Sequence, residues 1–251
     1  MVIAPITTLM RAGIIMCDEQ RNFRPQALLK LQSWLSPAFP IGSYSYSHGL
    51  ERAIEAGDVH DRKSLVDWLN ADICYGSARN EAIFFSGAWL STTAGDGTKL
   101  FKIAELAAAF RGTSEFAVES SQQGTACLAM VRQVWPDRAL DWLSEMLCEN
   151  QVQPALAVVL GVCLARQGIP ACVALPAFLQ SYVTNLVTAG IRLIPLGQTD
   201  GQLAIAELEE AILAAGAQAQ KATIDDLGSA AFMVDLASMA HETQYTRLFR
   251  S

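Results

Sequence analysis

Apolar side chains recur every three or four residues along most of the chain, and strict alternation of polar and apolar residues is rare. The first spacing places apolar side chains on one face of an α-helix, whereas a half-buried β-strand alternates every second residue. No run of four or more residues combines clean alternation with β-branched or aromatic enrichment. The pattern therefore predicts an all-α protein. Its two clearest apolar stripes are Leu100, Ile103, Ala107 and Phe110, and Ile205, Leu208, Ile212 and Ala215.

Polar residues, glycines and prolines divide the periodic segments into separate helices. Asp61 and Ser64 precede one such segment and mark the start of a helix. Thr199 with Gln202 matches a capping box, and Thr223 is the expected cap of a final helix that runs to about Tyr245. At ordinary helix lengths this division predicts roughly ten helices with short connections.

The absence of a linker, a repeat or a low-complexity tract favours one domain. We expect residues 25–251 to form a single all-helical, bundle-like domain. Residues 1–24 mix apolar and charged side chains without a secretory pattern, and we expect a loosely ordered N-terminal extension there.

Composition supports a folded protein that does not bind nucleic acid. Hydrophobic residues make up 51% of the chain, charged residues 17%, and the net charge of −7 disfavours a phosphate backbone as partner. The longest uninterrupted apolar run, 155–165, has 11 residues and is too short to span a bilayer. The six cysteines are scattered, which favours buried free thiols in a reducing cytoplasm.

Familiar catalytic and metal-binding signatures are missing from the sequence. The chain has three histidines, none paired with another at metal-ligand spacing, and His241-Glu242 is followed by Tyr245 where a zinc protease would have a second histidine. A small helical enzyme with an unrecognised site stays open as a weak alternative. An enclosed polar pocket with convergent titratable groups would favour it.

Residues 36–51 (SPAFPIGSYSYSHGLE) differ from ordinary helical sequence. Their prolines break any preceding helix, and Ser43 or Ser45 could then cap the helix that carries Glu51. One interpretation is a rigid corner between helices. The other is a surface that displays Tyr44, Tyr46 and His48 to a partner, because tyrosines suit interfaces.

Two further segments stand out. Residues 189–202 contain Arg192 in apolar company, which indicates either a structural pairing or a contact to an interface or a phosphate. The final segment, HETQYTRLFRS, places Leu248 and Phe249 between two arginines. We expect it to dock on a partner, although packing back on its own domain is the alternative.

These three segments resemble the UreF family of urease accessory proteins, and the resemblance covers nearly all of the chain beyond residue 24. It implies an all-helical, cytoplasmic, commonly dimeric protein that is not an enzyme. Such proteins join UreD (also called UreH) and the GTPase UreG on the urease apoprotein, where the complex delivers nickel to the active site. It also implies that the tail orders against UreD.

The resemblance places the candidate partner-binding residues in the three segments. They are Ser43, Tyr44, Tyr46, His48, Glu51, Arg192, Gln198, Asp200, Arg247, Leu248, Phe249 and Arg250. Without a His-rich tract, we expect nickel to be handled only transiently, with no tightly bound cofactor and no metal-ligand set. A scaffold for urease activation is the leading hypothesis, and regulation of UreG by an arginine such as Arg192 or Arg250 is the alternative.

Overall fold

The computed structural model describes residues 24–251, and within them the chain is all-α. That range contains no β-strand and twelve α-helices, close to the roughly ten expected from ordinary helix lengths. The expected extension at residues 1–24 lies outside the described residues, apart from Arg24. The helices are α1 (Pro25–Trp34), α2 (Leu50–Ala56), α3 (Arg62–Tyr75), α4 (Ser77–Ala94), α5 (Gly97–Ala109), α6 (Ser114–Val134), α7 (Arg138–Glu149), α8 (Leu156–Arg166), α9 (Ala171–Leu193), α10 (Gln198–Glu207), α11 (Glu209–Ala219) and α12 (Phe232–His241). Two short 3₁₀ turns are η2 (Ser43–Ser45) and η3 (Ile224–Asp226).

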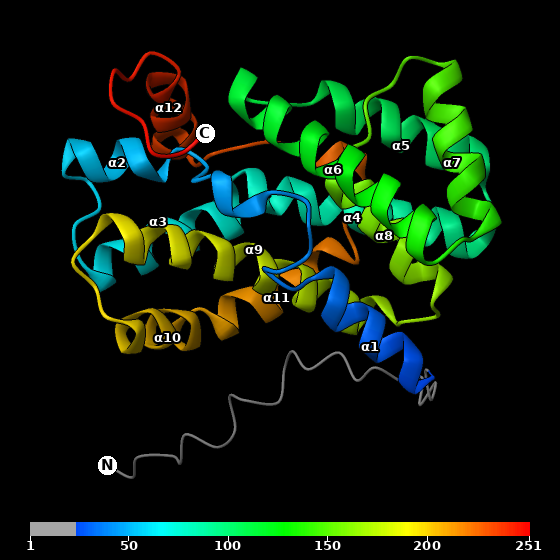
Figure 1. The fold of residues 1–251 in the computed structure, drawn as a ribbon, viewed down its shortest axis with the longest axis horizontal. Helices are drawn as coiled ribbons and strands as arrows, with labels where there is room; N and C mark the ends of the chain where they lie inside the picture. Colours follow the sequence, from blue (N-terminus) through cyan, green and yellow to red (C-terminus); the bar gives the residue numbers. More distant parts are fainter. Residues whose placement is uncertain (1–23) are drawn as a thin grey trace, which may run out of the picture.

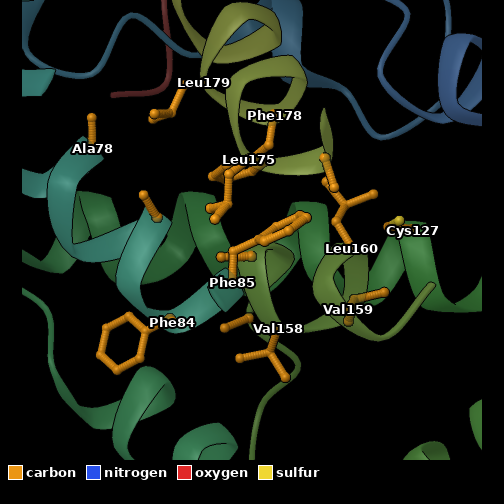
Figure 2. Packing of buried hydrophobic residues seen from close by; sticks show 14 of the residues in the cluster. Ala78, Phe84, Phe85, Cys127, Val158, Val159, Leu160, Leu175, Phe178 and Leu179 are labelled. Carbon is orange, nitrogen blue, oxygen red and sulfur yellow. The ribbon is translucent and has the colours of Figure 1, made fainter. Parts of the chain in front are cut away.

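The core is built around α4, α8 and α9, as Figure 1 shows. Phe85 of α4 stacks on Phe178 of α9 with ring centroids 5.0 Å apart, and Val158 and Leu160 of α8 fill the adjacent space (Figure 2). A Cβ atom at Gly161 would lie 2.6 Å from the carbonyl oxygen of Phe85. The glycine is therefore needed for the close approach of α8 to α4.

Helix α9 is 23 residues long and, by length and composition alone, apolar enough to cross a membrane. One such helix is weak evidence for a membrane span, because the central helix of a folded core passes the same test. Its apolar residues Leu175, Leu179 and Val183 are fully buried against neighbouring helices. Its polar residues Ser181 and Tyr182 hydrogen-bond to other parts of the same chain.

Several helix ends follow the predicted capping chemistry, and others do not. Asp61 caps α3 by accepting a hydrogen bond from the Ser64 N–H. Thr199 is not an N-cap: α10 begins one residue earlier, and Asp200 reaches back to the N–H of Gly197. Thr223 caps only η3, so the final helix starts later, at Phe232.

The prediction for the start of α2 was also wrong. Neither Ser43 nor Ser45 caps that helix, because both lie in η2. The N-cap is Gly49, and the hydroxyl of Ser47 accepts a hydrogen bond from the N–H of Glu51. Among the cysteines of the described part, Cys127 and Cys163 are buried free thiols as expected, whereas Cys148 is exposed.

Candidate functional site: the folded-back tail and the 36–51 segment

The C-terminal tail, residues 242–251, folds back on the 36–51 segment, as Figure 1 shows beside α2. The N–H of Arg250 donates to the carbonyl oxygen of Ser45 (2.8 Å), and the N–H of Ser47 donates to Ser251 O (2.9 Å). The hydroxyl of Ser47 also donates to that oxygen. The tail therefore packs on its own domain, as in the alternative that the sequence left open, and its docking on a partner stays a prediction.

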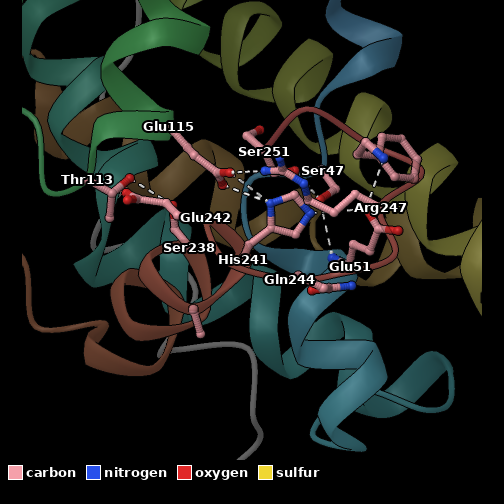
Figure 3. Close-up of polar contacts among 12 residues, drawn as sticks. Ser47, Glu51, Thr113, Glu115, Ser238, His241, Glu242, Gln244, Arg247 and Ser251 are labelled. Carbon is pink, nitrogen blue, oxygen red and sulfur yellow. Dashed lines mark hydrogen bonds and ion pairs between the residues drawn. The ribbon is translucent and has the colours of Figure 1, made fainter.

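Glu51, in the first turn of α2, binds the backbone of the tail. Its carboxylate accepts hydrogen bonds from the backbone N–H groups of Leu248 (2.7 Å) and Phe249 (2.9 Å). The same carboxylate contacts Nε2 of His241 at 3.1 Å (Figure 3). A buried carboxylate needs several donors of this kind, and here the tail supplies two of them.

His241 connects the end of α12 to both α2 and α6. Its side chain is completely buried, with Nε2 on Glu51 and Nδ1 2.9 Å from the Glu115 carboxylate. Arg247 of the tail contacts the same Glu115 at 3.1 Å. The result is a network in which His241 and two carboxylates are buried and Arg247 is partly exposed, drawn in Figure 3.

A second buried histidine, His48, lies at the other end of the contact. Its Nδ1 is 3.2 Å from Glu119 of α6, and Glu119 also accepts a hydrogen bond from the Ser251 hydroxyl (2.9 Å). The ring stacks on Phe116 with centroids 3.7 Å apart. Burial alone would lower the pKa of His48, but the charge and hydrogen bond of Glu119, with Asp72 and Asp235 farther off, raise it overall.

Ser77 lies between His48 and Asp72 and resembles, by position alone, the serine of a serine–histidine catalytic pair. The Ser77 hydroxyl is 2.5 Å from His48 Nε2, and it donates to the Asp72 carboxylate at 3.0 Å. Since its proton goes to Asp72, the serine accepts from the histidine. Activation of a serine nucleophile requires the opposite direction.

His48 and its polar contacts border a cavity of about 410 Å³. His48, Ser77 and Glu119 lie on its wall, as do Arg111 and its ion-pair partner Glu81. Burial lowers the pKa of Arg111 to about 10, against the charge of Glu119, which raises it. No group of three or more histidine, cysteine, aspartate or glutamate side chains suited to a metal ion occurs among the residues that the structure describes.

Arg192, from the 189–202 segment, contacts both the tail and the 36–51 segment. The Arg192 guanidinium lies 4.5 Å from the centre of the Phe249 ring, and its Nη1 donates to the Tyr44 carbonyl (3.1 Å). Phe249 itself is buried. Near them, the Tyr46 hydroxyl (2.5 Å) and the Arg250 guanidinium (3.4 Å) both donate to Gln122 of α6.

Nine of the twelve candidate residues thus gather where the tail meets the 36–51 segment, and Ser43 of η2 lies on the cavity wall. Gln198 and Asp200 do not gather there: Asp200 pairs with Arg62 of α3, and Gln198 is exposed at the start of α10. Sequence reasoning missed Glu115, Glu119 and Gln122, which hold the tail from α6. Their three-and-four spacing on one helix face was the available signal.

Around this contact the protein exposes apolar side chains. Tyr245 is fully exposed, Leu248 is 59% exposed, and Tyr44 is 68% exposed. Helix α12 adds a row at helical spacing, formed by Phe232, Leu236 and Met239. We call these six residues the outer face. Large apolar side chains gathered in this way are typical of protein contact surfaces.

The fold and this site define a single-domain helical protein whose C-terminal segment forms part of its own surface. A family model of UreF matches residues 59–209, and the chain belongs to the UreF family. It is 47% identical over 225 residues to the urease accessory protein UreF of Rhodopseudomonas palustris (strain BisB5), covering 90% of this chain and 91% of that protein. The UreF protein of Bradyrhizobium diazoefficiens is also 47% identical over 90% of this chain and 92% of its own length. That of Granulibacter bethesdensis is 44% identical over 90% of this chain and 94% of its own length.

Proposed function

We propose that this urease accessory protein is a non-enzymatic scaffold and chaperone. In this proposal it joins UreD/UreH and the GTPase UreG on the urease apoprotein during metallocentre assembly in the cytoplasm. Its family membership supports an accessory role, since similar proteins along nearly their full length bear that name. The observation that carries the scaffold role is the folded-back tail with the outer face around it.

The candidate residues divide into two roles within this proposal. Leu248 and Tyr44 are exposed and would touch UreD/UreH directly, together with the rest of the outer face. Glu51, His48 and Phe249 are buried and would position the tail without touching the partner. An apolar centre on a rigid support favours tight binding, because less side-chain and loop freedom is lost on association.

Nickel would be cargo rather than a resident cofactor. The cavity beside Glu119 and Glu81 offers carboxylates, but they are engaged by His48 and Arg111 respectively. This favours transient handling with no tight site. A stoichiometric nickel complex of the isolated protein, seen by calorimetry, would contradict that part of the proposal. We further propose a homodimer, in line with the family resemblance.

A regulatory effect on UreG is the second candidate function, and the exposure of Arg250 favours it. The residue is exposed, with a long hydrogen bond to Gln122 and the Tyr46 hydroxyl as a further neighbour. Arg192 is more constrained, because it bonds the Tyr44 carbonyl and lies over Phe249. An arginine supplied in trans can raise GTP hydrolysis by roughly 10³–10⁵.

The test of the proposed function is urease activation in cells that carry the urease operon with this gene deleted. Supplying the gene should restore urease activity and nickel content of the purified urease. Failure of the wild-type gene to restore either would refute the accessory role.

Turnover of GTP by purified UreG, with the wild type and with Arg250→Ala, separates the two candidate functions. Unchanged turnover with restored urease supports the scaffold, and arginine-dependent acceleration supports the regulator.

A further inference from the structure

Both ring nitrogens of His241 face carboxylates. Nε2 is 3.1 Å from Glu51 Oε2, and Nδ1 is 2.9 Å from Glu115 Oε2. Ionised carboxylates only accept hydrogen bonds, and a neutral imidazole has one N–H and one lone pair. A neutral ring would therefore turn a lone pair toward one carboxylate. The geometry is complete only when both nitrogens carry protons.

The charges around the ring lead to the same conclusion. The charged groups facing it are Glu51 from α2 and Glu115 from α6, with Arg247 of the tail on the far side of Glu115. Glu242, next in sequence, turns instead to the Ser114 hydroxyl (2.6 Å). Two carboxylates are balanced by Arg247 and a protonated His241. Without that proton the buried cluster carries an excess negative charge, which is costly away from water.

The same Glu51 carboxylate binds the ring and the backbone of the tail. Its two oxygens receive the N–H groups of Leu248 and Phe249 as well as Nε2 of His241. Loss of the ring proton removes one donor and leaves unbalanced charge at the point where the tail is attached. We propose that His241, protonated on both nitrogens, is a latch that holds residues 247–251 on the body by balancing the charges of Glu51 and Glu115.

His48 strengthens this latch at the far end of the tail. It pairs with Glu119, which holds the Ser251 hydroxyl, and the pKa of His48 is raised in the folded protein. The contact between His48 and Glu119 therefore favours the protonated histidine and weakens as pH rises. The inference goes beyond the scaffold role: it concerns this chain alone, and it stands or fails without any partner.

Hydrogen exchange of the full-length protein tests the latch. The backbone amides of Leu248 and Phe249 report on it directly, because both donate to Glu51. After correction for the intrinsic exchange rate, their protection at pH 6 should be roughly tenfold or more lower in His241→Gln than in the wild type, since a hydrogen bond to a charged group is lost. Protection in α8 should be the same in both proteins.

Two histidine variants sharpen the experiment. His241→Gln removes the positive charge of the ring and keeps one amide group as donor. His60→Gln is the matched control, because the His60 side chain is exposed and contacts only Gly57 and Asp61, so it should behave as wild type. Tail protection retained in His241→Gln would overturn the proposal.

A variant that fails to fold would not end the test. The ¹⁵N spectrum of the wild-type imidazole at pH 6 distinguishes a ring with two N–H groups from a neutral tautomer. Two protonated nitrogens at His241 support the latch, and a single protonated nitrogen refutes it.

Discussion

The carboxylate of Glu51 accepts a hydrogen bond from the backbone N–H of Phe249, 198 residues later in the chain, at 2.9 Å. The contact ties the first turn of α2 to the tail, and it buries the Phe249 side chain beneath Arg192. The tail is consequently part of the folded unit. A truncation from Arg247 onward should therefore destabilise the fold.

Replacing the Glu51 carboxylate tests how much the tail contributes to stability. Glu51→Gln places an amide NH₂ where three donors now converge, and it leaves the charge of His241 without one of its partners. We expect a loss of about 3 kcal/mol in the free energy of unfolding, measured in urea. Glu55→Gln on the same helix is the control, since Glu55 is exposed and pairs only with Arg52, and should cost under about 1 kcal/mol. Equal effects would contradict the role given to Glu51.

The glycines at the two ends of α2 should respond differently to alanine. Gly49 and Gly57 both have positive φ angles, +78° and +85°. A Cβ at Gly49 would lie 2.8 Å from the backbone nitrogen of Ser238 in α12, whereas a Cβ at Gly57 would meet nothing within 4 Å. Thermal or urea unfolding should show a cost of about 1 kcal/mol for Gly57→Ala and about 3 kcal/mol or more for Gly49→Ala. Similar costs would mean that α12 does not pack on α2 this closely.

Stability should decrease as pH rises above neutrality. The folded-state pKa of His48 is raised above the ordinary value of 6.5 for histidine, so its contribution is fully present below pH 6.5 and is lost as pH rises through the folded pKa. We expect a lower urea midpoint at pH 8.5 than at pH 6. His48→Gln should reduce this difference, and His60→Gln should preserve it. A midpoint that rises with pH in this range would contradict the assignment.

Alkylation should separate the cysteines by burial. Burial raises the pKa of Cys127 to about 12, and that of Cys163 well above its ordinary value, so neither forms much thiolate at pH 8. Cys148 is exposed. Iodoacetamide followed by peptide mass spectrometry should label Cys148 readily and leave the two buried thiols unlabelled until denaturant is added. Prompt labelling of Cys127 in native buffer would argue against the packing of α6 on α8.

The helical fold could largely be predicted from the sequence, because helix formation depends on the spacing and type of neighbouring residues. Apolar spacing identified helices such as α5, and Asp61 marked the start of α3 by its capping chemistry. The predictions failed where two local signals competed. Thr199 has a capping side chain, but α10 begins before it, at Gln198, and the N–H of Gly197 donates to the carboxylate of Asp200.

The candidate site could be predicted only in part from the sequence, because it depends on contacts between distant segments. The unusual composition of the 36–51 segment and the tail was visible, but nothing local indicates that Ser47 meets Ser251. Glu115 and Glu119 resemble solvent-facing residues of an amphipathic helix, yet both are buried. Their burial follows from the two histidines that neutralise them, and those histidines lie on other elements.

Co-purification with the cognate UreD/UreH tests most directly whether the exposed part of the tail binds a partner. The decisive variant is Tyr245→Ala with Leu248→Ala, which changes exposed side chains and leaves the Glu51 contacts intact, because those use the backbone N–H groups. Leu213→Ala on α11 is the matched control, as Leu213 and Leu248 are both 59% exposed. We predict that the wild type and Leu213→Ala capture the partner and that the double variant loses it at least tenfold. Equal capture by all three proteins, or none by the wild type, would contradict the account.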